Sequence, residues 1–451
     1  MILLVGQAMA SMDEEILVIA APNLRSDLHA SSAELQLVLA MYIVAFAALV
    51  VTGARLGDVI GRRRAFLLGL RGFTASSLAG GLAPTPAALI GIRALQGASA
   101  AVMTPQVLSI IQLQFESETR ARAIGAYSMV LAAGVAAGQV VGGLIVSVSG
   151  AWRPALLLNV PIGAALLPVA FRRLPDVHRG GRRRLDLAGA LLLSAALVGL
   201  VVPLSLGRDT GWPAWTWPCL LGCVLVFLAF VAREQSLSRR GRDPLFDLAV
   251  TRRPGITAGV VAVTTVMACY AGFLVALTLH LQTGLLFSPL VTGLIFTAYA
   301  AGFAVASLTW TRARGAVQAR LPTLGPLVMG AALLAVGAVA AGGGWPAAAT
   351  TPLLFCAGVG NAWAFSPLTN QLTSVVDAAQ TADVSGIIIT ASLVGQVLGV
   401  AAFVDVYFSA LPHGSAAAFA LTTAVLAAAL VPTAVCAVTA SRTRHTPLKR
   451  R

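Results

Sequence analysis

The side chains most able to do chemistry in this sequence are charged groups embedded in long apolar runs. Asp13, Glu14 and Glu15 lie in the middle of the first run, roughly residues 1–23, and Arg93 lies in a later run at about 86–114. A charge at the centre of a membrane helix costs about 2.5–3.5 kcal/mol, so each of these side chains needs a function or a partner. We predict that they bind protons or respond to protonation.

A buried acid and a buried arginine together suggest a coupling device. The guanidinium of Arg93 cannot be neutralised, so it needs a carboxylate, water or a substrate anion, and Gln96 lies one turn further on. A pair that protonation breaks and remakes would link proton binding to a conformational change. Successive helical residues are rotated by about 100°, so Asp13 and Glu15 face different directions, and a structural contact with a neighbouring helix is the alternative for each acid.

The elements that must position these groups are membrane helices. The chain has 451 residues, of which 58% are hydrophobic and 11% charged, and its mean hydropathy is +0.86. Soluble proteins carry about 25% charged residues. Apolar runs long enough to cross a bilayer recur along the whole chain. We predict an all-α polytopic membrane protein with fourteen transmembrane helices, at roughly 1–23, 35–55, 65–83, 86–114, 121–148, 154–171, 185–206, 214–232, 255–282, 290–310, 321–341, 346–373, 384–408 and 414–439.

The fourteen runs divide into groups of six, two and six. We expect an N-terminal six-helix bundle at 1–171, basic linkers with two inserted transmembrane helices at 172–254, a C-terminal six-helix bundle at 255–439 and a basic cytoplasmic tail at 440–451. Many transporters are built from repeated halves and bind their substrate near the middle of the membrane. The layout therefore favours a secondary transporter.

The loop ARLGDVIGRRR, residues 54–64, fixes the orientation of the chain. It joins two apolar runs through Asp58, Gly61 and three arginines, Arg62 to Arg64. Of the 31 lysines and arginines, 26 fall on the side of this loop and three on the other. Cationic loops remain in the cytoplasm, so we predict a multi-pass protein of the cytoplasmic membrane with both termini inside. The first run begins without a polar tail, which leaves room for a longer native N-terminus, and it lacks the basic start of a cleaved signal peptide.

Two further groups of residues have the types expected of a moving transporter. Gly134, Gly138 and Gly142, followed by Gly143, line a helix face suited to close packing, and this face could also control a conformational change. Uncharged polar and aromatic residues suit a permissive cavity for amphiphilic molecules, although a structural role is open for each. The cavity candidates are Gln96, His280, Gln282, Asn361, Trp363 and Asn370.

Several other classes of protein are disfavoured. The net charge of +14 comes from short loops on alternate sides of the apolar runs, which indicates topology and no nucleic-acid partner. No GxxxxGK[ST] motif is present, so we expect the proton gradient and not ATP to supply energy, without a cofactor. We see no metal-ligand cluster and no nucleophile–base pair, so an enzyme is not expected. The predicted partners are protons, the lipid bilayer and a small amphiphilic substrate, and the expected oligomeric state is a monomer.

Taken in order, these motifs resemble the major facilitator superfamily, specifically its fourteen-helix drug:proton antiporters of the multidrug-efflux type. Residues 54–64 are similar to the family's signature loop between the second and third helices, which locks the cytoplasmic gate. Ala54 and Val59 depart from the pattern. The matching residues of the loop are Leu56, Gly57, Asp58, Gly61, Arg62 and Arg63.

Three other segments share the resemblance. Residues 93–97, RALQG, match the fourth-helix motif, whose arginine is implicated in proton coupling. Residues 134–143, GVAAGQVVGG, are similar to the antiporter motif of the fifth helix, which has proline where this chain has Gln139. Residues 12–22 resemble the first-helix motif, and Glu14 and Glu15 depart from it. Further matches are Asp13 and Pro22, and Gly386, Gly395 and Gly399 in the thirteenth helix.

The resemblance implies the major facilitator fold and export of amphiphilic drugs or antibiotics by alternating access, driven by protons. In this interpretation Asp13 binds the proton, Arg93 responds to it, and Asp58 with its basic neighbours forms a gate. Two alternatives stay open on the sequence alone. The chain could be a dedicated exporter, or even an importer, of one endogenous metabolite, or it could be a transport-inactive membrane receptor or regulator.

Overall fold

The computed structural model describes residues 1–114, 117–174, 186–209, 211–240, 250–251, 253, 255–374 and 381–442. Within these ranges the secondary structure is helical, with fifteen α-helices and no strand. The helices fall into two compact units, one built mainly from residues 1–233 and the other mainly from residues 246–285 and 295–451. The prediction of an all-α protein is confirmed.

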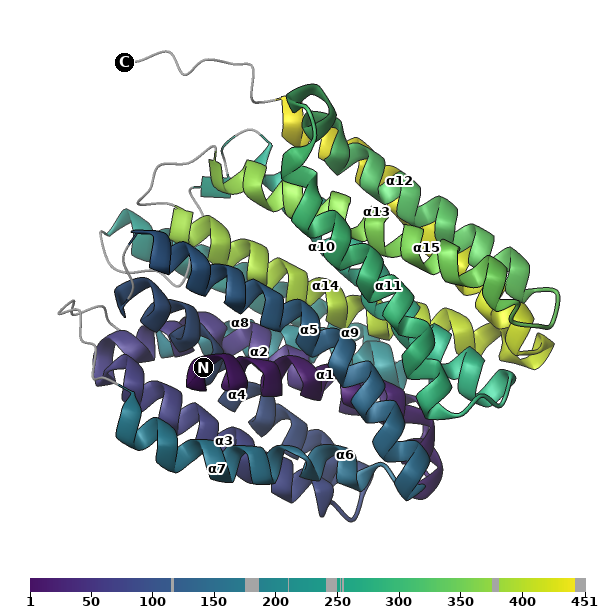
Figure 1. Ribbon diagram of the computed structural model, residues 1–451, viewed down its shortest axis with the longest axis horizontal. Helices are drawn as coiled ribbons and strands as arrows, with labels where there is room; N and C mark the ends of the chain where they lie inside the picture. The colour runs from purple at the N-terminus through teal and green to yellow at the C-terminus, as the bar shows by residue number, and fades with distance from the viewer. Residues whose placement is uncertain are drawn as a thin grey trace. The chain divides into compact units, whose positions relative to one another are not determined.

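The first unit contains the helices that carry the buried charges. Within it α2 and α3 each pack along α4, α1 packs along α5, α3 lies beside α7, and α8 packs against α2 (Figure 1). Its helices are α1 (Ile2–Asp27), α2 (Ser32–Ile60), α3 (Arg62–Gly81), α4 (Pro86–Gln114), α5 (Ser117–Ser149), α6 (Arg153–Leu157), α7 (Asn159–Arg173), α8 (Leu187–Asp209) and most of α9 (Thr216–Arg239).

In the second unit, too, long helices pack along one another. Here α10 packs along α14 and α15, and α12 packs along α13 and α15 (Figure 1). A π-helical turn, His280–Gly284, extends α10. The helices are α10 (Ile256–Leu279), most of α11 (Pro289–Thr309), α12 (Gly315–Ala340), α13 (Ala347–Ser374), α14 (Thr381–Ala410) and α15 (Ser415–Arg442).

Ten helical segments of the described chain are long and apolar enough to cross a membrane. They comprise α2, α4, α6 with α7, α8, α9, α10, α11, α12, α14 and α15. Among the helices outside this set, α1 has three carboxylates at its centre and α3 begins with three arginines. The four remaining segments, α1, α3, α5 and α13, still coincide with predicted spans, so fourteen crossings stay a prediction.

The signature loop is shorter than the sequence suggests. Helix α2 begins with a capping box, in which the Ser31 hydroxyl accepts from the Glu34 amide at 3.1 Å and the Glu34 carboxylate accepts from the Ser31 amide at 2.9 Å. It then continues to Ile60, and α3 starts at Arg62. Gly61, with φ of 93° and ψ of 137°, alone connects the two helices. The predicted loop 54–64 is therefore mostly helix, because this one glycine reverses the chain.

Replacing Gly61 with alanine is expected to lower the free energy of unfolding by about 1–3 kcal/mol, because a side chain disfavours this backbone conformation. The matched control is Gly222→Ala, at a helical position in α9 where a Cβ atom meets nothing within 4 Å. That control is expected to be neutral or slightly stabilising. Thermal unfolding of the purified variants measures both, and equal melting temperatures would contradict a strained turn at Gly61.

Candidate functional site

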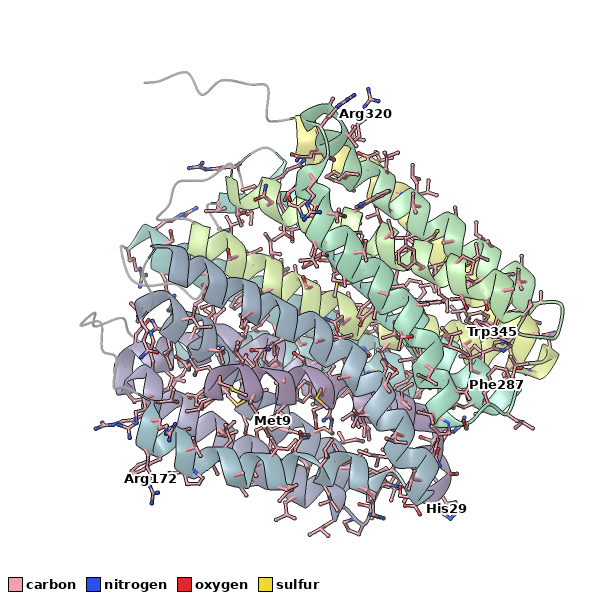
Figure 2. The ribbon with its side chains drawn as sticks, in the orientation of Figure 1. Met9, His29, Arg172, Phe287, Arg320 and Trp345 are labelled. Atoms are coloured by element: carbon pink, nitrogen blue, oxygen red, sulfur yellow. The ribbon has the colours of Figure 1, made fainter. Side chains whose placement is uncertain are left out.

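Asp13 is the centre of a buried polar network in the first unit. Its side chain is 0% exposed, and Met9, one turn earlier on α1 and labelled in Figure 2, is 2% exposed. The Asp13 carboxylate accepts three hydrogen bonds from two other helices: from Arg93 Nη1 to Oδ2 at 2.5 Å, from Gln96 Nε2 to Oδ1 at 2.9 Å and from Asn159 Nδ2 to Oδ1 at 2.6 Å. The charged form of Asp13 is thus fully partnered.

The Arg93 guanidinium completes the network from α4. Its Nη1 also donates to Gln96 Oε1 at 2.7 Å, and its central carbon lies 4.4 Å from the centre of the Tyr42 ring, a cation–π contact. Gln96 Nε2 donates in turn to Ser77 Oγ at 2.8 Å. Arg93 is 1% exposed, and its Nε atom is buried with no hydrogen-bond acceptor among the described residues. Five helices, α1, α2, α3, α4 and α7, meet at this pair.

Local backbone features explain why these side chains converge. A Cβ atom on Gly97 would overlap the carbonyl oxygen of Tyr42, so the glycine lets α4 approach α2 and brings the Tyr42 ring over Arg93. The predicted single helix at 154–171 is broken at Leu158 into α6 and α7. Asn159 is the first residue of α7 and points its amide at Asp13.

The three acids of α1 do not share one environment. Asp13 contacts α4 and α7, whereas Glu15, 5% exposed, faces α5 and accepts a short hydrogen bond from Gln139 Nε2. Glu14 is half-buried, and no hydrogen bond of its carboxylate is among those of the described residues. Asp13 and Glu15 thus face different helices, as the rotation of about 100° per helical residue predicts.

The glycines of α5 form the surface that receives α1. Positions for a Cβ atom on Gly134, Gly138 and Gly142 would meet Ser11, Met12 and Ile16 in turn. The neighbouring Gly143 is buried as well, but the nearest atoms to its Cβ position belong to Pro289 and Leu290. The three glycines spaced by four therefore line one close helix contact. Their part in a conformational change stays a prediction.

The signature residues around Gly61 form a second polar group. Arg62 pairs with Asp58 across one turn, with side chains 14% and 24% exposed. Arg63 reaches α7, where it donates to the carbonyl oxygen of Phe171 and lies 5.2 Å from the centre of that ring. Arg172, the next residue of α7, is exposed and points away from the helices in Figure 2. The group joins the α2–α3 turn to the end of α7.

Two cavity candidates of the second unit, His280 and Asn361, are connected through aromatic rings. Phe419 lies beside Phe273 and Phe273 lies beside Tyr299, with ring centres 6.2 and 6.0 Å apart. His280 is 0% exposed and stacks on Phe419 with ring centres 4.7 Å apart, beside Trp345 at 6.3 Å. Asn361 Nδ2 donates to the Tyr299 hydroxyl at 2.9 Å. Buried Gln282, half-buried Trp363 and exposed Asn370 lie elsewhere on the π-turn and α13.

Several partners in both units were not predicted. Asn159, Ser77 and Tyr42 complete the Asp13 network, and Tyr299 completes the Asn361 contact. A polar amide or an aromatic hydroxyl within an apolar run is the only signal that the sequence offers for such residues. That signal does not say which helix the side chain contacts.

Comparison with known proteins identifies the class of this helical membrane protein as a transporter. The family model described as Major Facilitator Superfamily matches residues 3–400. The chain therefore belongs to the major facilitator superfamily. The resemblance read from its motifs is confirmed, and so is the prediction that it is no enzyme.

Relatives of known name are similar over most of the chain. The "probable actinorhodin transporter" of Streptomyces coelicolor is 33% identical over 418 residues, 91% of this chain and 72% of that protein. The cephamycin export protein CmcT of Amycolatopsis lactamdurans is 35% identical over 410 residues, 87% of this chain and 81% of the relative. The multidrug resistance protein Stp of Mycobacterium tuberculosis is 30% identical over 402 residues, 88% and 73%.

Solved transporters share the fold at low sequence identity. A POT family transporter in complex with 5-aminolevulinic acid superposes with a TM-score of 0.70 and 15% identity, over 99% of this chain and 96% of that one. A bacterial homologue of the human lysosomal transporter Spinster gives a TM-score of 0.68 with 16% identity, over 98% and 96%. The major facilitator fold expected from the motifs is confirmed.

Proposed function

We propose that this chain exports an amphiphilic organic molecule of antibiotic type across the cytoplasmic membrane in exchange for protons. The names of the relatives support the substrate class, because they include transporters or exporters of actinorhodin and cephamycin and a multidrug resistance protein. The observation that carries the proton exchange is the ion pair of Asp13 and Arg93, 2.5 Å long and almost wholly excluded from solvent.

The network supplies a mechanism in which protonation changes helix contacts. A proton on Asp13 removes its negative charge and leaves Arg93 without its counter-ion, so the buried pair loses its main stabilising term. The hydrogen bonds from Gln96 and Asn159 then hold a neutral acid, which is a weaker acceptor than a carboxylate. Since these donors lie on α4 and α7, the contacts of α1 with both helices depend on the proton. This dependence would bias the protein between states open to opposite sides of the membrane.

The orientation follows from the arginine distribution. We propose that the Asp58–Arg62 pair and Arg63 lie at the cytoplasmic face, where they would stabilise a closed state of the gate. Arg172 and Arg173 end α7 beside Arg63, which adds positive charge to the same end of the unit. By the same rule, we propose that both termini lie in the cytoplasm.

The decisive experiment is substrate flux driven by a pH gradient in proteoliposomes, with wild type and Asp13→Asn. The variant keeps an acceptor for Gln96 and Asn159 but cannot bind a proton, so pH-driven accumulation is expected to vanish. Energy-independent exchange of labelled for unlabelled substrate is the control for folding and binding, and it is expected to persist. Undiminished pH-driven accumulation by Asp13→Asn would rule out Asp13 as the proton carrier.

A second candidate is a dedicated exporter of one compound. It is favoured by the relatives named for single products, such as actinorhodin and cephamycin. A deletion strain separates the two: sensitivity to many unrelated compounds indicates multidrug export, whereas retention of a single product inside the cell indicates the dedicated role.

A further inference from the structure

Two departures from the family's motifs touch each other in the structure. Glu15 departs from the first-helix motif, and Gln139 stands where the fifth-helix motif has proline. They are 124 residues apart in sequence, yet Gln139 Nε2 donates to Glu15 Oε2. The contact sits beside Gly138, whose Cβ position would meet the Cβ atom of Glu15 and the backbone of Met12. A side-chain bridge thus joins α1 to α5 at this position.

The hydrogen bonding of this bridge depends on a proton. Gln139 is 2% exposed, and its Oε1 atom is buried with no hydrogen-bond donor among the described residues. A carboxylic acid and a primary amide can form two antiparallel hydrogen bonds, because the amide N–H donates to one acid oxygen and the acid O–H donates to the amide oxygen. A carboxylate has no hydrogen to donate. Protonation of Glu15 at Oε1 would therefore satisfy the Gln139 acceptor.

We propose that Glu15 is a second proton-binding residue, separate from Asp13, and that Gln139 is the positioning residue that recognises its protonated form. The inference rests on the proposed proton exchange for its role in transport. The proton comes from solution and is bound at Oε1, where it is shared with Gln139 Oε1. Protonated Glu15 ties α1 to α5 by two hydrogen bonds, and ionised Glu15 leaves one buried amide oxygen unsatisfied.

Several charged groups that the structure describes on the helices around α1 have partners of their own. Arg93 on α4 and the Tyr42 ring on α2 face Asp13, and Arg153 on α6 pairs with Asp27 at 3.3 Å. On α1 itself, Asp13 and Glu14 immediately precede Glu15 in sequence. The remaining charged residues described on α2 and α7 lie toward the helix ends, namely Glu34, Arg55, Asp58, Arg172 and Arg173. The residues of α5 shown to meet α1 are uncharged, namely Gly134, Gly138, Gln139 and Gly142, and the charged residues of α5, namely Glu118, Arg120 and Arg122, belong to its first turns.

Infrared spectroscopy of the full-length, unliganded protein in detergent tests the proposal directly. At neutral pH the wild type is expected to show a C=O stretching band of a protonated carboxylic acid that Glu15→Gln lacks and that Gln139→Leu shifts. Glu34→Gln is the control, because it lies at the start of α2, outside the buried network, and glutamine can keep the capping box there, so this variant is expected to retain the band. Glu15→Gln can still pair with Gln139 as two amides, so its fold is expected to be kept.

The outcomes separate this proposal from the proposed function. Identical carboxylic-acid bands in wild type and Glu15→Gln at every pH would show that Glu15 stays ionised and would overturn the inference. An unshifted band in Gln139→Leu would overturn the role of Gln139. The band is measured without transport, so a failure of proton-driven flux in the wild type would leave it unchanged.

Discussion

Replacing Arg93 with methionine is expected to abolish pH-driven transport and to lower the free energy of unfolding by about 3–5 kcal/mol, because it leaves the Asp13 carboxylate buried without its counter-ion. Asp13 is 0% exposed, so neither water nor rotation of the side chain can readily replace the lost charge. Flux in proteoliposomes and the melting temperature of the purified protein measure the two effects. The matched control is Arg71→Met, an exposed arginine on α3 in the same unit, with little change expected in stability.

A double variant separates the effect of Arg93→Met on stability from its effect on pH-driven transport. In the double variant Asp13→Asn with Arg93→Met, no uncompensated charge remains in the network, and Gln96 and Asn159 retain an amide acceptor. The double variant is therefore expected to recover most of the lost stability while remaining inactive in pH-driven transport. If its stability fell as far as the sum of the single changes, the two side chains would not be energetically coupled.

Replacing Gly97 with valine is expected to destabilise the first unit by about 1–3 kcal/mol or more and to stop transport, because there is no room for a side chain between α4 and α2. Its Cβ position overlaps the Tyr42 carbonyl oxygen, a backbone atom that can move only with its helix. Displacing α2 would also withdraw the Tyr42 ring from Arg93. The effect is thus expected on both the fold and the proton-coupling network.

Gly91→Val supplies the control for this prediction on the same helix. A Cβ atom at Gly91 meets nothing within 4 Å, and valine there changes helix propensity by only a few tenths of a kcal/mol relative to glycine. Thermal unfolding of both variants, followed by flux measurements on those that fold, compares the two positions. Equal melting temperatures for Gly97→Val and Gly91→Val would contradict the close α2–α4 approach.

The positions of the helices could be predicted from the sequence, because each membrane helix is formed by one continuous apolar segment. The apolar runs predicted the helices within a few residues, since length and hydropathy are local properties. The chain reversal at Gly61 and the helix break at Leu158 were harder to predict from the sequence, because each is made by a single residue. Neither changes the local hydropathy enough to mark a boundary.

The candidate site was only partly predictable, because its contacts join distant segments. The free-energy cost of burying a charge identified Asp13 and Arg93 as residues that need partners. Helix periodicity predicted that the side chains of Asp13 and Glu15 point in different directions. Asn159 is 146 residues from Asp13 and is uncharged, so no local pattern assigned it to the network. The contact of Glu15 with Gln139 likewise appears only when α1 and α5 are packed together.

The close helix contacts determine which positions of this fold can tolerate substitution. In both units a glycine lets the backbone of one helix approach that of another: Gly97 meets Tyr42 in the first, and Gly358 meets Tyr299 in the second. The atoms that would meet a side chain there are carbonyl oxygens, which every residue possesses. Mutation can therefore exchange one apolar residue for another over the outer surfaces of the helices while these crossing points stay intact. The architecture of each unit is therefore specified in part by positions that carry no side chain.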